Sequence, residues 1–317
     1  MRVIRGLPKR RLRTPLSLAA GVFDGVHLGH REIVSTAVRL SEARGCVSAV
    51  LTFVPHPDTV LLRKGAPPVL TTLDEKLALL RSLGVQLAII ARFDRSLART
   101  PAEMFVRDLL VRRLHACYLA VGEGWRFGAG GQGDTRLLER LARECGFQFC
   151  GCPPVLVNGK PVSSTRIREC VAKGRMEEAA QLLGRPYQLS NAVVAGDQRG
   201  RQLGFPTANL TPPPSKAMPP DGSYAGWAGV SRWSPAVISI GVRPTFGPRG
   251  ERRIEAHLLD PARPARLLGR RLRVAFAARL REERRFGAVE ALVQQIATDC
   301  RQAAAVLAAL QPPPDML

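Results

Sequence analysis

Two histidines lie three residues apart, His27 and His30, in the segment GVFDGVHLGH at 21–30. The segment follows an apolar run and is rich in glycine, which is typical of a turn that leads from a strand into a helix. Both imidazoles can then face an anion held at the helix N-terminus. Two imidazoles and free backbone N–H groups can stabilise charge on phosphoryl oxygens without a covalent nucleophile. The pattern predicts attack on the α-phosphate of a nucleotide.

A second segment, SSTRIR at 163–168, places hydroxyl groups and two arginines, Arg166 and Arg168, near another helix start. Hydroxyls, backbone N–H groups and guanidinium groups are suited to holding the β- and γ-phosphates of a nucleotide. Each motif alone has a simpler interpretation. An H-x-x-H pair can bind metal or cap a helix, and Ser163 or Ser164 can be an ordinary N-cap. Together, the two motifs favour nucleotidyl transfer.

The second half contains candidates for a different phosphate chemistry. The segment GDQRGRQLGFPTANL at 196–210 is rich in glycine and ends with Thr207 and Asn209, which share one side of an extended strand. Their oxygens suit Mg²⁺ held together with nucleotide phosphates. Glu255, on a predicted strand, could accept a proton from a hydroxyl that attacks a γ-phosphate. The simpler interpretations are a turn for PTAN and a solvent-facing strand residue for Glu255.

Alternating elements are expected to position the first set of residues. Short apolar runs at 16–23, 46–53, 85–91 and 117–121 predict parallel strands joined by helices. Thr72 and Glu75 form a capping box for a helix that ends near Leu83, and Thr100 with Glu103 predicts another. This half is predicted to be α/β.

After Arg185 the pattern changes to short strands separated by glycine and proline, at 191–195, 224–230, 236–240, 254–259 and 272–276. Such spacing predicts an antiparallel barrel or sandwich. A proline-rich stretch at 212–220 is expected to be a surface loop. An amphipathic helix at about 288–310 is expected to pack against the barrel.

The composition is that of a folded protein with 317 residues, 45% of them apolar, which is enough for two domains. No stretch approaches the roughly 18 to 20 apolar residues of a membrane helix, so we expect a soluble, cytoplasmic protein. The net charge of +21 favours anionic ligands. Seven irregularly spaced cysteines predict no disulfide framework, and the C-x-C pair at Cys150 and Cys152 lacks the partners of a zinc site.

Several motifs occur together in a specific order. The first half has GVFDGVHLGH, then TFVPHP at 52–57, VGEGWRFG at 121–128 and SSTRIR. This half resembles the nucleotidyltransferase module of the prokaryotic bifunctional riboflavin kinase/FAD synthetases. The second half resembles the riboflavin kinase module of the same family through PTAN, SIGVRPTFG at 239–247 and RIEAHLLD at 253–260. The resemblance covers essentially the whole chain after about residue 15.

The resemblance implies a Rossmann-like FMN adenylyltransferase (FAD synthetase) domain over 1–185 and a β-barrel riboflavin kinase domain with a terminal helix over 186–317. ATP would phosphorylate riboflavin to FMN and then adenylylate FMN to FAD, with release of pyrophosphate. By resemblance, His27 and His30 act at the ATP phosphates. Thr207 and Asn209 bind Mg²⁺, and Glu255 is the catalytic base.

Further residues are implied to bind the nucleotide or the flavin. In the first half they are Gly21, Phe23, Asp24, Gly29, Phe53, His56, Trp125, Arg126, Ser163, Ser164, Thr165, Arg166 and Arg168. In the second half they are Gly204, Phe205, Pro206 and Arg243. His56, between two prolines, is equally consistent with a rigid turn residue.

The sequence departs from the family pattern at several positions. Gly124 stands where Asp or Asn is usual, which removes a hydrogen bond to the flavin, although Trp125 keeps an aromatic surface. Val22 and Ser239 each replace an Asn that is usual in the family. RLLG at 266–269 replaces Asp-Leu-Tyr-Gly.

Two alternative functions remain. The first is a riboflavin kinase with weakened or lost adenylylation, because of Gly124. The second is a basic nucleic-acid-binding protein, which the dispersed arginines and the low content of aromatic residues do not favour. The expected partners are riboflavin, FMN and ATP, without a membrane, and the sequence leaves the oligomeric state open.

Overall fold

The computed structural model describes residues 1–62, 65–196, 199–243, 251–260 and 267–314. Contacts divide the chain into two compact units. The first comprises residues 1–67 and 76–163, and the second comprises residues 68–75 and 164–316. By contacts, residues 68–75 and 164–185 therefore belong with the C-terminal part of the chain. The domain boundary expected at residue 185 stays a prediction.

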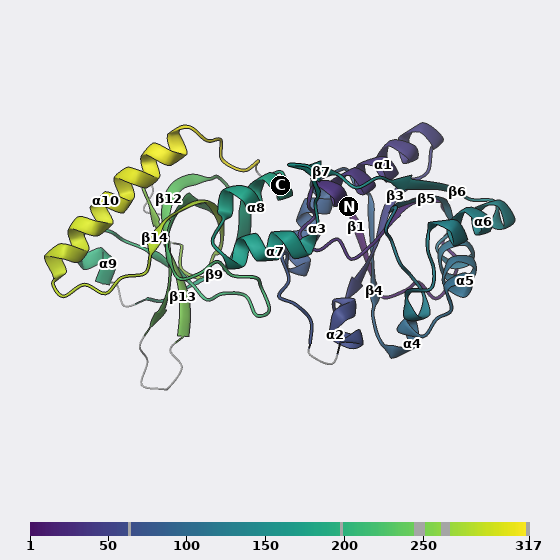
Figure 1. The fold of residues 1–317 in the computed structure, drawn as a ribbon, viewed down its shortest axis with the longest axis horizontal. Coiled ribbons are helices and arrows are strands. Elements are labelled where there is room, and N and C mark those ends of the chain that lie inside the picture. Colours follow the sequence, from purple (N-terminus) through teal and green to yellow (C-terminus); the bar gives the residue numbers. More distant parts are fainter. Residues whose placement is uncertain (63–64, 197–198, 244–250, 261–266, 315–317) are drawn as a thin grey trace. The chain divides into compact units, whose positions relative to one another are not determined.

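The first unit is built on a six-stranded sheet in the order β1-β4-β3-β2-β5-β6, with every neighbouring pair parallel (Figure 1). Its strands are β1 (Arg2–Arg5), β2 (Leu16–Ala20), β3 (Val47–Val54), β4 (Leu87–Arg92), β5 (Ala116–Gly122) and β6 (Gln148–Cys152). A small antiparallel pair follows, β7 (Leu156–Val157) and β8 (Lys160–Pro161).

Helices connect these strands. They are α1 (Leu28–Arg44), α2 (Pro57–Leu61), α3 (Leu73–Ser82), α4 (Arg95–Ala98), α5 (Ala102–Met104), the π-helix η1 (Phe105–Arg113), the 3-10 turn η2 (Ala129–Gly131) and α6 (Thr135–Cys145). The predicted parallel α/β architecture is confirmed. All five residues of β2 are buried, as expected for a strand covered on both faces. The Ser17 hydroxyl donates to the Ala37 carbonyl at 2.7 Å and so ties β2 to α1.

The capping box predicted at Thr72 and Glu75 is confirmed. The Thr72 N–H donates to a Glu75 carboxylate oxygen at 2.9 Å, and the Glu75 N–H donates to Thr72 Oγ1 at 3.3 Å. The second predicted box is wrong, because the Thr100 hydroxyl donates to the Ser96 carbonyl at 3.3 Å. Helix α5 consequently begins without a side-chain cap and continues into η1.

The second unit contains a closed barrel of antiparallel strands in the order β10-β13-β12-β11-β14-β9. The predicted barrel with a terminal helix is thus confirmed. Its elements are α7 (Ser164–Ala172), α8 (Met176–Leu183), β9 (Tyr187–Val194), α9 (Arg199–Gln202), β10 (Ala208–Leu210), β11 (Gly222–Gly229), β12 (Ser234–Arg243), β13 (Glu251–Leu258), β14 (Arg271–Glu282) and α10 (Val289–Ala308).

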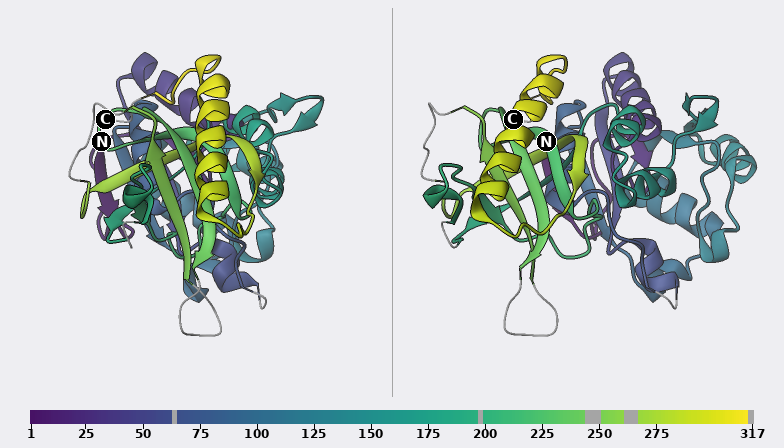
Figure 2. Two further views of the ribbon diagram at one scale, coloured as in Figure 1. Left: turned by 90° about the vertical axis from the view of Figure 1, so that its left-hand side faces the viewer. Right: turned by 60° about the vertical axis from the view of Figure 1, so that its left-hand side comes forward.

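Helix α10 crosses the outside of the barrel, as both views in Figure 2 show. Its residues Ala303 and Leu307 pack into an apolar cluster with Trp227 of β11 and Val237 of β12. The buried Asp299 accepts hydrogen bonds from Nε and Nη2 of Arg281 at 3.0 and 2.8 Å. The helix is therefore held by apolar packing and by one charged anchor.

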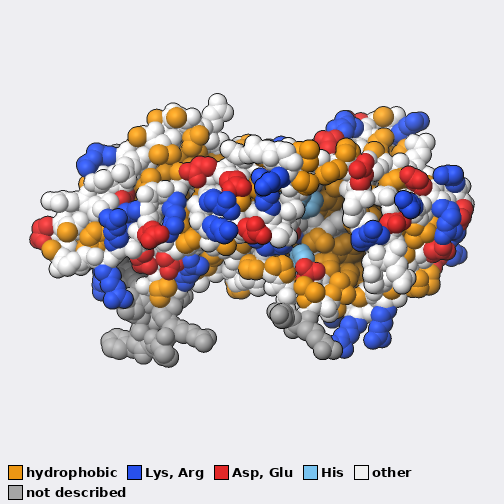
Figure 3. All heavy atoms as spheres, in the orientation of Figure 1, with side chains coloured by type: hydrophobic (Ala, Val, Ile, Leu, Met, Phe, Trp, Pro, Cys, Tyr) orange, Lys and Arg blue, Asp and Glu red, His pale blue; other side chains and the backbone are white. Residues whose placement is uncertain are grey.

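In the described part of the chain, no helix is long and apolar enough to cross a membrane. All seven cysteines carry free thiols. On the face drawn in Figure 3, Lys and Arg side chains are interspersed with Asp and Glu.

Candidate active sites

The two histidines of the first motif lie at the N-terminus of α1. His27 is the N-cap, and its Nδ1 accepts a hydrogen bond from the His30 N–H at 3.3 Å. The two imidazole rings stack with centroids 3.6 Å apart and an interplanar angle of 18°. His27 is buried and His30 is half-buried. The structure therefore brings both rings to one helix N-terminus, where backbone N–H groups and the helix dipole favour an anion.

The turn that precedes α1 has an uncommon backbone. Phe23 and Val26 have φ angles of 51° and 42°, and Gly25 between them has 85°. L-residues rarely adopt positive φ, and a β-branched residue such as Val26 is a genuine outlier. The turn directs the Phe23 ring edge-on toward His30, with centroids 5.3 Å apart. Strained conformations of this kind are typical of functional sites.

Three other predicted residues of this motif lie in this turn or beside it. Asp24 is 2% exposed and has an interaction partner in the structure. Gly21 lies under the Phe23 ring, since an added Cβ would come within 3.1 Å of it. Gly29 lies beside the His27 ring, where an added Cβ would come within 3.3 Å.

The residues predicted near the flavin have mixed surroundings. Phe53 is buried at the end of β3 and packs edge-on against Phe93. His56 is the N-cap of α2, and its Nδ1 accepts from the Asp58 N–H at 3.2 Å, which agrees with a turn residue. The Trp125 ring stacks on Phe127 with centroids 4.7 Å apart.

Two positions beside Trp125 are open to solvent. The exposed Arg126 has its Nη1 3.5 Å from an Asp134 carboxylate oxygen. A Cβ added at Gly124 would meet no atom of the described residues within 4 Å, so none of their side chains fills the place where the family usually has Asp or Asn.

The SSTRIR motif straddles the division between the units. Ser163 ends the first unit, whereas Ser164 and Thr165 begin α7 in the second. Arg168 Nε donates to the Pro68 carbonyl at 2.8 Å, and Arg166 Nη2 lies 3.7 Å from a Glu178 carboxylate oxygen. The predicted role of these residues at the ATP phosphates stays a prediction.

The three residues predicted to take part in catalysis in the second half lie together on the outer face of the barrel: Thr207, Asn209 and Glu255. Asn209 of β10 and Glu255 of β13 are directly paired across the two strands. The Thr207 hydroxyl lies 3.4 Å from a Glu255 carboxylate oxygen, within hydrogen-bonding distance. Glu255 is half-buried between Ile254 and Ala256, whose buried side chains face the interior.

Gly196, at the start of the glycine-rich segment before β10, lies against Asn209. A Cβ at Gly196 would collide with the Asn209 amide, and one at Gly200 would collide with the Phe205 carbonyl. Gly204 has a φ of 87°, a conformation that favours glycine. Phe205 packs edge-on against His257, whose Nδ1 lies 2.9 Å from the Pro206 carbonyl oxygen. The backbone at Gly196 therefore lies too close to the Asn209 amide to admit a side chain.

The predicted Arg243 is the last residue of β12. The loop after it, residues 244–250, lies outside the described residues, as do residues 261–266. The part of RPTFG that follows Arg243 and the first residue of RLLG therefore lie outside the described residues.

The residues at the barrel site fit a hard divalent cation. Asn209 is 6% exposed, and its Oδ1 has no hydrogen-bond partner among the described residues. A buried, unpartnered carbonyl oxygen is costly unless a ligand completes it. Together with the Thr207 hydroxyl, it supplies the oxygen donors that Mg²⁺ prefers.

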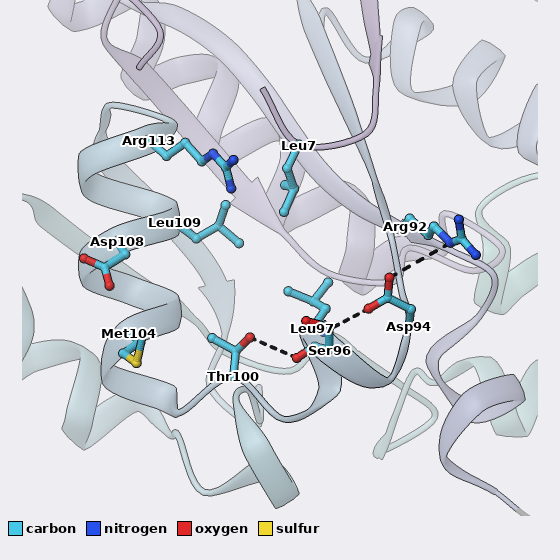
Figure 4. A pocket seen from close by; sticks show the side chains of 10 residues that line it. All are labelled: Leu7, Arg92, Asp94, Ser96, Leu97, Thr100, Met104, Asp108, Leu109 and Arg113. Atoms are coloured by element: carbon cyan, nitrogen blue, oxygen red, sulfur yellow. Dashed lines mark hydrogen bonds and ion pairs between the residues drawn. The ribbon is translucent and has the colours of Figure 1, made fainter. Parts of the chain in front are cut away.

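A separate pocket of about 390 Å³ lies at the carboxyl end of β4 (Figure 4). Its lining residues are Leu7, Arg92, Asp94, Ser96, Leu97, Thr100, Met104, Asp108, Leu109 and Arg113. None of them is a predicted site residue.

Sequence reasoning missed one residue of the first site. Lys76, on α3, is 6% exposed, and its ammonium group donates to the Val22 carbonyl at 2.7 Å. A lysine on an amphipathic helix gives no signal that it points inward, so only the structure reveals it.

Comparison with known proteins identifies a family for each half of the chain. A model of the FAD synthetase family matches residues 9–166, and a model of the riboflavin kinase family matches residues 183–307. A bifunctional riboflavin kinase/FMN adenylyltransferase from Escherichia coli strain K12 is 39% identical over 284 residues, which cover 89% of this chain and 90% of that protein. One from Bacillus subtilis is 33% identical and covers 90% of each chain.

A solved structure shares the fold. A crystal structure described as a macrolide-efflux protein from Streptococcus pneumoniae superposes with a TM-score of 0.84 and 26% identity, covering 96% of this chain and 99% of that one. That description applies to the S. pneumoniae protein. What the comparison shows for this chain is a shared fold. Since both family models match in sequence and the E. coli relative is similar over most of its length, the chain belongs to the family of bifunctional riboflavin kinase/FMN adenylyltransferases.

Proposed function

We propose that the chain catalyses two successive reactions. At the barrel it phosphorylates riboflavin to FMN with ATP, and at the N-terminus of α1 it transfers AMP from ATP to FMN, giving FAD and pyrophosphate. The observation that carries this proposal is family membership over nearly the whole chain. We further propose a cytoplasmic location, with these small molecules as the partners.

Glu255 is the proposed base at the barrel. Its carboxylate accepts the proton of the riboflavin 5′-hydroxyl as that oxygen attacks the γ-phosphorus of ATP, and ADP leaves as the bond from the γ-phosphorus to the bridging oxygen breaks. The neighbouring Thr207 hydroxyl and Asn209 Oδ1, which has no hydrogen-bond partner in the described part of the chain, support this assignment, because they place oxygen ligands beside the base. Thr207 and Asn209 would hold Mg²⁺, which when bound neutralises charge on the ATP phosphates.

His27 and His30 are proposed to act on the second ATP. Their imidazoles donate hydrogen bonds to the oxygens of the α-phosphate while an FMN phosphate oxygen attacks its phosphorus and pyrophosphate leaves. The N–H groups at the start of α1 contribute fixed dipoles that need no reorganisation during the reaction. The stacked rings support a shared role, since both lie at the same helix terminus.

The experiment that tests both assignments uses purified protein with MgATP and either riboflavin or FMN, followed by chromatographic separation of the flavins. We expect Glu255→Gln to lower FMN formation from riboflavin by about a hundredfold or more while FAD formation from added FMN persists. We expect His30→Ala to abolish FAD formation and to leave FMN formation intact. Loss of both reactions in either variant when each substrate is supplied would contradict the division into two sites.

A second candidate function keeps the kinase and weakens adenylylation. The open space at Gly124 favours it, since no side chain in the described ranges replaces the polar group that is usual there. Accumulation of FMN without FAD under excess ATP would support this candidate. Restoration of FAD formation by Gly124→Asn would identify the cause.

A further inference from the structure

The ammonium group of Lys76 is buried against the turn that carries the two histidines. Its Nζ donates to the Val22 carbonyl at 2.7 Å and lies 3.5 Å from Thr52 Oγ1. The Thr52 hydroxyl donates to the same Val22 carbonyl at 2.9 Å. Lys76 is 6% exposed and Thr52 is fully buried. Two donors from different elements, α3 and β3, therefore converge on one carbonyl oxygen.

Keeping a charged amine at this place is costly. Desolvation by burial lowers the pKa of Lys76 to about 8, although the nearby carboxylate of Asp24 acts in the opposite direction. An apolar side chain of similar length would fill the same space without that cost. A purely space-filling role therefore does not explain a lysine here, whereas a directed hydrogen bond does.

The bonded carbonyl lies where the backbone becomes strained. Val22 immediately precedes Phe23, the first of the three positive-φ residues that end at Val26. Such conformations persist only where the surrounding structure holds them. Fixing the Val22 carbonyl fixes the peptide plane that enters the turn, and the turn delivers His27 to the N-cap of α1.

We propose that Lys76 is a positioning residue for adenylyl transfer, which holds the Val22 carbonyl so that the turn presents His27 and His30 together at the N-terminus of α1. This inference rests on the proposed function of that site. Lys76 acts through the backbone and touches no reacting atom. Its loss is therefore expected to reduce the rate of the chemical step more than the binding of substrates.

The test compares Lys76→Met, Lys76→Arg and Thr52→Val with the wild type, using FMN and ATP as substrates and measuring kcat and KM separately. For Lys76→Met we expect kcat for FAD formation to fall by about a hundredfold, the effect of a small misalignment, with KM for ATP and FMN nearly unchanged. Lys76→Arg keeps a charged donor and should recover a substantial part of kcat. Thr52→Val removes one neutral donor and should lower kcat by about threefold to tenfold.

Two controls accompany the variants. FMN formation from riboflavin, measured in the same samples, should be unchanged in all of them, because the variants leave the barrel residues untouched. Lys9→Met removes an exposed lysine from the same unit and should leave FAD formation unchanged.

The outcomes separate this inference from the proposed function. Absence of FAD formation in the wild type would refute the adenylylation itself. If the wild type forms FAD, wild-type kcat in Lys76→Met, or a rise of KM at unchanged kcat, would overturn the positioning role alone. If circular dichroism shows that Lys76→Met does not fold, Thr52→Val becomes the test. An unchanged kcat for FAD formation in Thr52→Val would then overturn the proposal.

Discussion

Replacing Lys76 with methionine is expected to change how the stability of the first unit depends on pH. Desolvation by burial lowers the pKa of the Lys76 ammonium from an ordinary value of 10.5 to about 8. In the unfolded chain the same amine is fully hydrated and regains its ordinary pKa. The folded state therefore binds this proton more weakly than the unfolded state does.

The sign of the effect follows from proton linkage. Between the two pKa values the unfolded chain binds more protons, so the stability contributed by this group rises as pH increases. Below about pH 8, burial of the protonated amine lowers the free energy of unfolding by its full amount, roughly 3 kcal/mol for a pKa difference of this size. Between about pH 7 and pH 9.5 the wild type should gain about 2 kcal/mol relative to Lys76→Met.

Urea unfolding at the two pH values measures this difference. Trp125 is the only tryptophan of the first unit, so its fluorescence reports on that unit once Trp227 and Trp233 are replaced by phenylalanine in every variant. Comparing differences between variants cancels the titration of other groups. The difference in free energy of unfolding between the wild type and Lys9→Met, a change at an exposed position, should stay constant over the same pH range. A constant difference between wild type and Lys76→Met across this range would refute a buried ammonium at Lys76.

Three further predictions concern the second unit. Gly196→Ala would place a Cβ 2.7 Å from Asn209 Cγ and should lower the rate of FMN formation about tenfold or more. In the control variant Gly287→Ala the added Cβ has no described atom within 4 Å, and the rate should be unchanged. Asn209→Ala should raise the Mg²⁺ concentration needed for half-maximal FMN formation by about tenfold or more, and an unchanged Mg²⁺ titration would contradict its role as a ligand. Asp299→Asn leaves the Arg281 charge uncompensated and should cost about 3 kcal/mol of barrel stability in urea unfolding; a cost below about 1 kcal/mol would show that the anchor of α10 is weak.

Local patterns were sufficient to predict the main elements of both units. The strands β2 to β5 are short apolar runs, and the barrel strands are separated by glycine and proline. The apolar pattern and these turn residues were enough to predict them. The strands β1 and β6 escaped prediction. β1 has only four residues and begins and ends with arginine, and β6 has a glycine, Gly151, in its interior. Pairing with a neighbouring strand, rather than intrinsic preference, stabilises both.

In the candidate sites, too, the sequence predicted which residues close together in the chain share a surface, but not which distant residues pair. His27 with His30 are close in sequence, and Thr207 with Asn209 follow a strand period, so spacing alone placed each pair on one surface. The pairing of Asn209 with Glu255 depends on strand register over 46 residues of chain, which the family resemblance supplied and the local pattern did not.

Buried charges are where sequence reasoning failed, because charged residues on a helix or in a loop are ordinarily solvated. The proline-rich stretch at 212–220 was expected to be a surface loop, but its Lys216 is buried and forms an ion pair with Glu75. Lys216 Nζ also donates to the Leu70 carbonyl at 2.8 Å, and Glu75 accepts from the Ser190 N–H at 2.9 Å. The capping box explains only part of what Glu75 does.

Glu75 and Lys76 are consecutive on α3, and both are buried with specific partners. Glu75 joins the segment 68–75 to the barrel, whereas Lys76 holds the turn before α1. Uncharged side chains at these two positions could bury the same surface at a lower desolvation cost. The directed hydrogen bonds of Glu75 and Lys76 therefore explain the charged residues better than packing does. Glu75→Gln leaves the buried ammonium group of Lys216 without its carboxylate partner, so it should lower the free energy of unfolding of the barrel unit by about 3 kcal/mol in urea unfolding; a loss below about 1 kcal/mol would contradict this role of Glu75.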